Sequence, residues 1–372
     1  MNSSLHKGCP RKLRGVNLGG WLVLEKWMTP SLFEGLQALD ETSYCVELGE
    51  LAQQSLKAHW DTFITAEDFA WLASMGINAV RIPVGHWIFG AGYPYHPAYG
   101  ESSSPYVAGG IEILDRAFDW AEQFQLQIVL DLHAAPGCQN GFDNGGIQNV
   151  CDWPKDASYI NYSLEVLERL AERYQDRSVL HAIEVLNEPR WDIETSVLKT
   201  FTTKAYHRIR RYCKADQVAI VFHDGFRSFH EYDGFLPEPE YSHVIFDIHR
   251  YQCFDPKDQD ADIYTHIAHS VIEWKQEADD IIKSLCHSTY VGEWSLGLDL
   301  KMEAHWLHAS YDYSLQTIDE FQRSLFYKGY AAAQLLTFEK YLGWFFWSYK
   351  TETMPQWSFR DCVEKGWLGG RF

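Results

Sequence analysis

Two glutamates, Glu188 and Glu293, follow short apolar runs, one in VLNEPRW and one in YVGEWS. A buried carboxylate is costly unless it is paired, hydrogen-bonded or used in chemistry. Two carboxylates that flank one bond are what glycoside hydrolysis requires, because one donates a proton to the leaving oxygen while the other attacks the sugar or activates water. The pair predicts a glycosidase site if the fold brings the two side chains together.

Other polar residues end similar apolar runs. Asn187 could hold a sugar 2-hydroxyl, an interaction that strengthens in the transition state. Arg81 and Tyr251 could keep Glu293 ionised as a nucleophile, because a cation and a donated hydrogen bond both favour the charged form. Glu188, in a more apolar setting, would keep its proton as the general acid. The remaining polar residues of this kind are Asn17, His133, His223, Asp224, His249 and Trp347.

Eight apolar runs alternate with stretches of helical periodicity. Strands that alternate with helices pair in parallel, and eight of them can close into a barrel. An open doubly wound sheet would bring a G-x-G-x-x-G turn, but VNLGGW is followed by WLVLEKW. We predict an α/β fold, a single-domain (β/α)8 TIM barrel over residues 1–372, with residues 1–13 as an N-terminal extension. The predicted strands are 12–20, 78–84, 126–133, 180–188, 217–225, 243–251, 288–295 and 342–350, and the predicted helices are 66–76, 110–125, 158–175, 196–213, 262–286 and 319–336, with a weaker link after 217–225.

All strands of such a barrel end at one rim, where catalytic residues lie. Taken singly, each polar residue has a simpler explanation, because a lone glutamate often belongs to a structural ion pair and a lone histidine is often a satisfied core group. Their gathering on one rim favours an active site.

The composition narrows the class of ligand. The chain carries 51 acidic and 32 basic residues, a formal charge of -19, which argues against nucleic acid as a partner. Its 15 tryptophans suit stacking on sugar rings as well as core packing. No apolar run reaches the roughly 18 residues of a membrane helix, so we expect no membrane span.

The N-terminus and the cysteines bear on the compartment. MNSSLHKGCPRKLRG has no apolar segment behind its basic residues, so the sequence as it stands predicts a cytoplasmic protein, and a secreted one if a native leader was removed. Sequons at Asn2 and Asn161 keep secretion open. The eight cysteines lack C-x-x-C spacing, and Cys138 with Cys151, which bracket a Gly/Asn-rich loop, is the first candidate for a disulfide.

Motifs of other hydrolase classes are absent from the sequence. There is no H-E-x-x-H, and His266 and His269 share a helix face without a third ligand nearby in sequence, so we expect neither metal nor cofactor. A G-x-S-x-G nucleophile turn is also absent.

The strand-end motifs resemble those of the fungal exo-β-1,3-glucanases of glycoside hydrolase family 5. The similar segments run in order from Arg14 to Phe359, nearly the whole chain. They are RGVNLGGWLVLEKWMTPSLFE, AVRIPVGHW, LDLHAAPGCQNGFDNGG, LNEP, IHRYQCF, VGEWS and GWFFWSYKTETMPQWSF. LNEP and GEW mark the wider family, whereas QNGFDN and the first and last segments are specific to the exoglucanase branch.

The resemblance implies a retaining mechanism, with Glu188 as acid/base and Glu293 as nucleophile. Phe142 and Phe254 align with phenylalanines that clamp the +1 sugar at the entrance. Glu25, Asp143 and Asn144 align with residues that grip the terminal glucose and close the pocket. The residues that align around the −1 sugar are Arg81, His133, Asn187, His249, Tyr251 and Trp347.

The resemblance implies a β-glucan or β-glucoside substrate and an exo-acting β-glucosidase, with transfer of glucose to other acceptors as a further outcome. Relatives that act on glucosylated lipids or flavonoid rutinosides use the same two glutamates, and a non-catalytic carbohydrate-binding barrel is the alternative outside enzymes. Loops at 93–106 and 299–313 are expected to decide among substrates. GEWSLGLDLK lacks a cysteine that family members carry in a disulfide, which leaves the disulfide pattern and secretion open. The oligomeric state is open, with a monomer expected.

Overall fold

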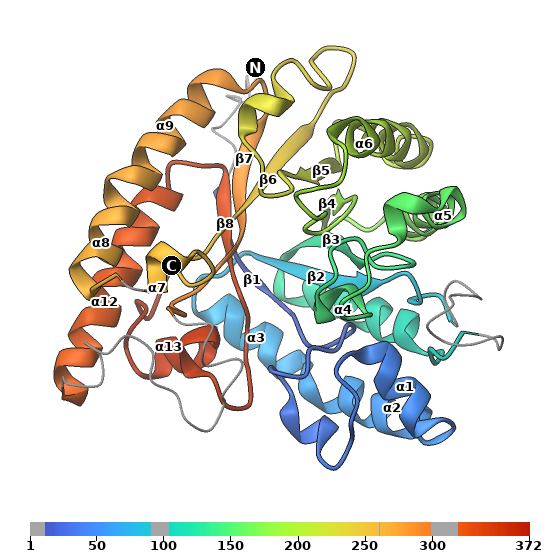
Figure 1. Ribbon diagram of the computed structural model, residues 1–372, viewed down its shortest axis with the longest axis horizontal. Helices are drawn as coiled ribbons and strands as arrows, with labels where there is room; N and C mark the ends of the chain where they lie inside the picture. The colour runs from blue at the N-terminus through green and yellow to red at the C-terminus, as the bar shows by residue number, and fades with distance from the viewer. Residues whose placement is uncertain (1–11, 91–103, 260, 299–318) are drawn as a thin grey trace, which may run out of the picture.

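The computed structural model describes residues 12–90, 104–259, 261–298 and 319–372, and its eight parallel strands close into a barrel in sequence order (Figure 1). This (β/α)8 architecture confirms the predicted fold class. The strands are β1 (Leu13–Asn17), β2 (Ala79–Gly85), β3 (Gln127–Ala134), β4 (Leu180–Glu184), β5 (Ala219–His223), β6 (Val244–Arg250), β7 (Ser288–Trp294) and β8 (Gly343–Phe346).

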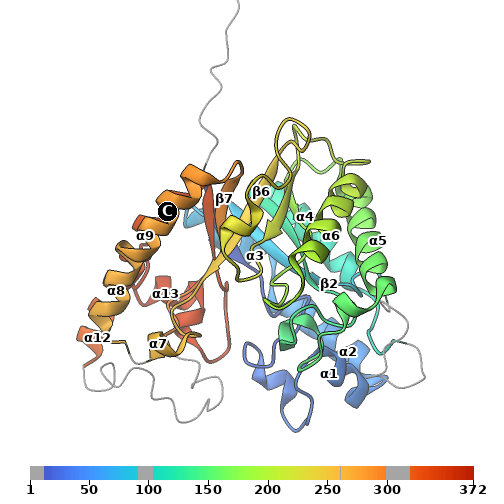
Figure 2. The same ribbon diagram turned by 45° about the horizontal axis from the view of Figure 1, so that its top comes forward.

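Helices surround the barrel. In Figures 1 and 2, α5 and α6 cover one side and α8, α9 and α12 the opposite side. The α-helices are α1 (Glu41–Leu48), α2 (Leu51–Phe63), α3 (Ala66–Ser74), α4 (Gly110–Phe124), α5 (Ala157–Tyr174), α6 (Thr195–Ile209), α7 (Pro256–Gln259), α8 (Ile263–Val271), α9 (Glu273–Ser284), α12 (Glu320–Phe338) and α13 (Phe359–Glu364). The short 3-10 helices are η1 (Pro30–Phe33), η3 (Asp143–Gly145), η4 (Trp153–Lys155), η5 (Phe229–Tyr232) and η6 (Pro355–Trp357).

The barrel interior has an apolar lower part and a polar upper part. Because side chains alternate along a strand, residues two apart on one strand share a face. On β3, apolar Val129 is followed on the same face by Asp131 and His133, and all three are fully buried. On β6, Ile245 is followed in the same way by Asp247 and His249. The titratable residues thus gather toward the carboxyl ends of the strands.

Some connections differ from those expected. Helices α1 and α2 precede α3, and both were missed, although Ala52, Leu56 and Trp60 recur at the four-residue spacing of a buried helix face. The helix expected over 262–286 divides into α8 and α9 at Ile272, and the weak link after β5 contains η5.

The structure also bears on the predicted disulfide and on the expected absence of a membrane-spanning helix. None of the seven described cysteines forms a disulfide, so the suggested pairing of Cys138 with Cys151 is wrong here. Both thiols are buried within their loop, where Cys138 Sγ lies 3.2 Å from the backbone nitrogen of Gly141 and Cys151 Sγ lies 3.4 Å from the carbonyl oxygen of Gln139. Among the described helices, none is long and apolar enough to cross a membrane.

Candidate active site

The two predicted catalytic glutamates lie beside one histidine. Glu293 is on β7, and Glu188 follows β4 with a left-handed backbone (φ 42°). Nδ1 of His249, on β6, is 2.6 Å from Glu188 Oε1 and 3.4 Å from Glu293 Oε2. These oxygens can therefore be separated by no more than the sum of the two distances. This upper limit is smaller than the carboxyl separation of roughly 6.5–9.5 Å in inverting glycosidases. It is compatible with the separation of ~5 Å in retaining glycosidases.

Arg81 is the cation at the centre of the site. Its fully buried guanidinium lies 3.0 Å from Glu293 Oε1 and 2.7 Å from Glu184 Oε2. Nη2 is 3.1 Å from Asp131 and donates to Asn187 Oδ1 at 2.8 Å. Burial alone would lower the pKa of Arg81, but the three carboxylates raise it well above its ordinary value. Arg81 therefore stays charged and holds the ends of several strands in fixed positions.

The pKa values of both glutamates are raised. Burial is the largest cause in each case, and it raises the pKa of Glu293 to about 7 despite the opposing effects of His249 and Arg81. The direct contacts of Glu188 are not the apolar setting expected from the sequence, because its oxygens face His249 Nδ1 and, at 3.5 Å, Asn144 Nδ2. Removal from water, and not an apolar contact, raises the pKa of Glu188 above its ordinary value and so favours its protonated form.

Tyr251 donates a hydrogen bond of 2.8 Å to Glu293 Oε2. This bond lowers the pKa of Glu293, so in Tyr251→Phe we expect that pKa to rise and the acidic limb of the pH profile to move to higher pH. Because a hydrogen bond to a charged group contributes about 1.5–3 kcal/mol, kcat/KM should fall by roughly 10- to 100-fold. The measurement is kcat/KM between pH 4 and 9. Exposed Tyr264→Phe is the control, and an unmoved limb would contradict this role for Tyr251.

One wall of the site combines residues that lie on or just after strands β3, β4 and β8. The ring of His133 stacks on Trp347 with centroids 5.4 Å apart, and Asp131 lies 2.6 Å from His133 Nδ1. Asn187 Nδ2 is 3.4 Å from His133 Nε2. The structure therefore brings these predicted residues together with Arg81 at the rim.

The residues expected to grip the terminal glucose lie near Glu188 and Glu293. Glu25 is buried, and its Oε2 accepts a hydrogen bond from Trp27 Nε1 at 2.9 Å. Burial and the charge of Asp143 raise the pKa of Glu25 well above normal, while burial raises the pKa of Asp143 to about 6. Asn144, by contrast, contacts Glu188 itself.

The two predicted entrance phenylalanines are exposed. Phe142, after β3, is 38% exposed, and Phe254, after β6, is 50% exposed. Phe254 packs edge-on against Tyr251, with ring centroids 5.4 Å apart. The loops expected to decide the substrate, 93–106 and 299–313, lie mostly or wholly outside the described residues.

Several buried polar residues of the site were not singled out from the sequence. Gln139 donates to the carbonyl oxygens of His133 and Asn187, at 2.7 and 2.9 Å, and so joins two strand ends. Its position in the QNGFDN motif could have identified Gln139 as a residue of the site. Asp131, Glu184 and Asp247 form a layer of buried carboxyl groups beneath the rim. Asp131 and Asp247 stand two residues before His133 and His249 on the same strands, and Glu184 ends β4 three residues before Asn187.

Two groups of described side chains are close enough to share a metal ion: Glu188, His223 and His249, and Glu184, Asp247 and His249. In the first group, Nδ1 of His223 accepts the Gly225 N–H at 2.9 Å, so its proton is on Nε2. A protonated nitrogen cannot coordinate a metal, which weakens that set as a ligand sphere.

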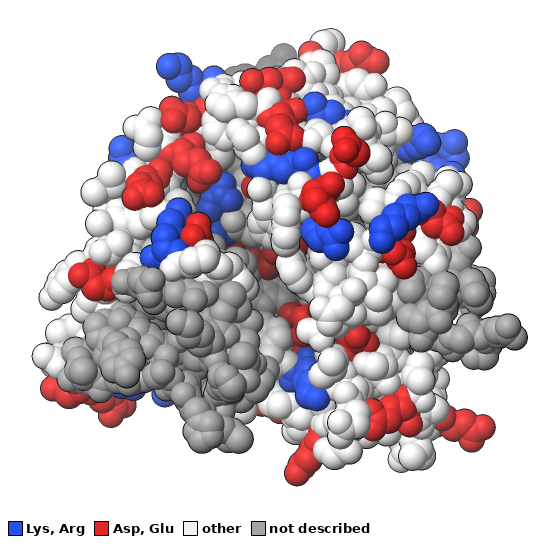
Figure 3. All heavy atoms as spheres, viewed as in Figure 1, with Lys and Arg blue, Asp and Glu red and all other residues white. Residues whose placement is uncertain are grey.

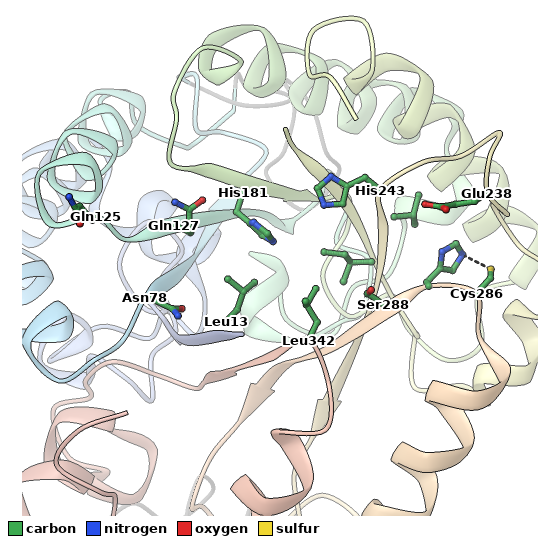
Figure 4. A pocket seen from close by; sticks show the side chains of 13 residues that line it. Leu13, Asn78, Gln125, Gln127, His181, Glu238, His243, Cys286, Ser288 and Leu342 are labelled. Carbon is green, nitrogen blue, oxygen red and sulfur yellow. Dashed lines mark hydrogen bonds between the residues drawn. The ribbon is translucent and has the colours of Figure 1, made fainter. Parts of the chain in front are cut away.

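The molecular surface offers more than one hollow. Figure 3 shows a hollow near the middle of the face drawn, with acidic side chains visible in it. A separate cavity of about 630 Å³ lies at the other end of the barrel, around the strand starts Leu13, Gln127 and Ser288 (Figure 4). None of the predicted site residues lines that cavity. We therefore place the active site at the carboxyl rim, where the charged residues gather.

A closed (β/α)8 barrel with two carboxylates beside one histidine nitrogen defines the class of barrel glycosidases. The family description "Cellulase (glycosyl hydrolase family 5)" matches residues 40–351. A glucan 1,3-beta-glucosidase of Blumeria graminis is 37% identical over 389 residues, covering 96% of this chain and 86% of the relative. One from Lachancea kluyveri is 35% identical, covering 95% and 85%. The chain belongs to glycosyl hydrolase family 5 and is a glycoside hydrolase.

Solved structures agree on the fold. The rutinosidase from Aspergillus niger has a TM-score of 0.77 at 20% identity, covering 96% of this chain and 97% of that chain. At this identity, the likeness concerns the fold alone.

Proposed function

We propose that this protein is a retaining exo-β-glucosidase that removes terminal glucose from β-1,3-glucan or related β-glucosides. We infer the retaining mechanism from the position of His249 Nδ1 between the two carboxylates, because this position limits the distance between them. The glucan substrate is inferred from the names of the relatives in Blumeria and Lachancea.

In the proposed mechanism, Glu293 attacks the anomeric carbon while Glu188 gives its proton to the leaving glycosidic oxygen. The C–O bond to the aglycone breaks, and a glucosyl ester forms on Glu293. Glu188, now ionised, takes a proton from water, which displaces Glu293 and releases β-glucose. Arg81 and Tyr251 stabilise the carboxylate of Glu293 before attack and after release.

The test is a product analysis on laminari-oligosaccharides, with NMR following the anomer released first. We expect β-glucose to appear before mutarotation, and to come from one end of the oligosaccharide. Early α-glucose would contradict the retaining mechanism, and products of mid-chain cleavage would contradict the exo assignment.

A flavonoid rutinoside and a glucosylated lipid serve as parallel substrates. Release of intact rutinose, or of glucose from the lipid alone, would be consistent with the two-glutamate mechanism. It would contradict β-glucan as the substrate. Carbohydrate binding without any turnover would favour the non-catalytic barrel.

A further inference from the structure

Two strands carry the same aspartate-x-histidine pattern, LDLH on β3 and FDIH on β6. In both, the two side chains share the interior face. Asp131 Oδ2 lies 2.6 Å from Nδ1 of His133, whereas Asp247 Oδ2 lies 3.4 Å from Nε2 of His249. The two aspartates therefore lie against opposite ring nitrogens of their histidines. Asp247 lies near Nε2 of His249, so Nδ1 of that ring faces Glu188 and Glu293.

Beneath His249, three buried polar atoms lack a well-aligned hydrogen bond: Asp247 Oδ2, Glu184 Oε1 and His249 Nε2. Of these, Asp247 Oδ2 and His249 Nε2 approach each other to 3.4 Å. The three side chains present ligand atoms within 4.8 Å of one another. The other oxygen of each acid is occupied, because Asp247 Oδ1 accepts the Gly292 N–H at 2.7 Å and Glu184 Oε2 accepts Arg81 Nε. The absence of a side chain on Gly292 permits this approach, since a Cβ there would overlap the Asp247 carboxylate.

One proton shared by Asp247 and Glu184 would satisfy this cluster. Burial and then the charge of Glu184 raise the pKa of Asp247 well above normal, as expected for two carboxyls that cannot both ionise. With that proton between Glu184 Oε1 and Asp247 Oδ2, the Asp247 oxygen can still accept an N–H from His249. A metal ion fits less well, because the Arg81 guanidinium already neutralises Glu184.

We propose that Asp247 is a positioning residue that holds the single ring proton of His249 on Nε2, so that Nδ1 stays bare and accepts the O–H of Glu188. This inference rests on the proposed function, in which Glu188 is the acid. A neutral imidazole has one N–H, and the partner of one nitrogen decides the state of the other. A proton on Nδ1 would instead be donated to Glu188 and would favour its ionised form.

The surroundings of His249 are consistent with a neutral ring. Burial lowers the pKa of His249 to about 4, although the charge of Glu293 opposes this. The groups that face Asp247 and His249 from the neighbouring elements are Arg81 on β2, His133 on β3, Glu184 and Glu188 on and after β4, His223 on β5, and Tyr290 and Glu293 on β7. His223 contacts the ring of His249 edge to face, with centroids 4.2 Å apart.

The first experiment is ¹⁵N NMR of the histidine rings in the wild-type protein, with the signals of His249 assigned by their loss in His249→Gln. We expect a protonated Nε2 and a bare Nδ1 at neutral pH. The opposite tautomer, or a doubly protonated ring, would overturn the proposal. This readout needs no turnover, so it remains informative if the proposed glucosidase activity fails.

The second experiment is Asp247→Asn, which places an NH₂ group against His249 Nε2. We expect the ring proton to move to Nδ1 and the alkaline limb of kcat/KM on laminari-oligosaccharides to move to lower pH by about one unit, a roughly tenfold loss at alkaline pH. Asp131→Asn, the same change in the matching pair on β3, should leave the His249 tautomer in place. Loss of activity in Asp247→Asn with an unchanged tautomer would reduce Asp247 to a structural role and overturn the inference.

Discussion

Glu293→Gln should abolish turnover on every substrate. The amide keeps the shape of the side chain but cannot form the glucosyl ester, so we expect kcat/KM to fall by about 10⁴-fold or more, equivalent to roughly 5.5 kcal/mol. The same loss is expected with activated aryl glucosides, because a better leaving group does not replace a nucleophile. The measurement is initial rate on laminaribiose and on a dinitrophenyl glucoside.

Two further observations make this prediction specific to the nucleophile. Added azide should restore turnover of the aryl glucoside in Glu293→Ala by attacking the anomeric carbon directly, which gives the α-glucosyl azide. Glu273→Gln, the same change at an exposed position of α9, should leave the rate unchanged. Substantial activity in Glu293→Gln would show that another group is the nucleophile.

Glu188→Ala should separate substrates by their leaving groups. Proton donation contributes typically 10²–10⁴-fold, so kcat/KM on laminaribiose should fall by about that factor. A dinitrophenolate needs little proton assistance, so kcat/KM on that glucoside should fall by less than about tenfold. The second step lacks its base, so the glucosyl enzyme should accumulate and KM should decrease.

Mass spectrometry of Glu188→Ala during turnover should detect the chain with one added glucosyl group, which peptide mapping should place on Glu293. Azide should increase the rate of this variant too. The product should be the β-glucosyl azide, because azide here attacks the glucosyl enzyme. An equal loss on both substrates would exclude Glu188 as the acid.

The sequence predicted some of the neighbours in the site but not others. The alternation of apolar runs with helical stretches predicted the barrel, and parallel strands necessarily present their carboxyl ends at one rim. Glu188, Arg81 and His249 were therefore expected to be neighbours although they are far apart in sequence. By contrast, the pairing of Asn144 with Glu188 depends on the path of the loop after β3, and no periodicity encodes that path.

By itself, the sequence determined the fold class and the placing of Glu188 and Glu293 at one rim of the barrel, because hydrophobic periodicity and strand-end polarity are local properties of the chain. Only the tertiary structure decided which atom faces which: the approach of both glutamates to His249 Nδ1, the link made by Gln139, and the layer of Asp131, Glu184 and Asp247 below. These contacts follow from strand stagger and from side-chain packing across the barrel. Both are set by the closure of eight strands and not by any one segment.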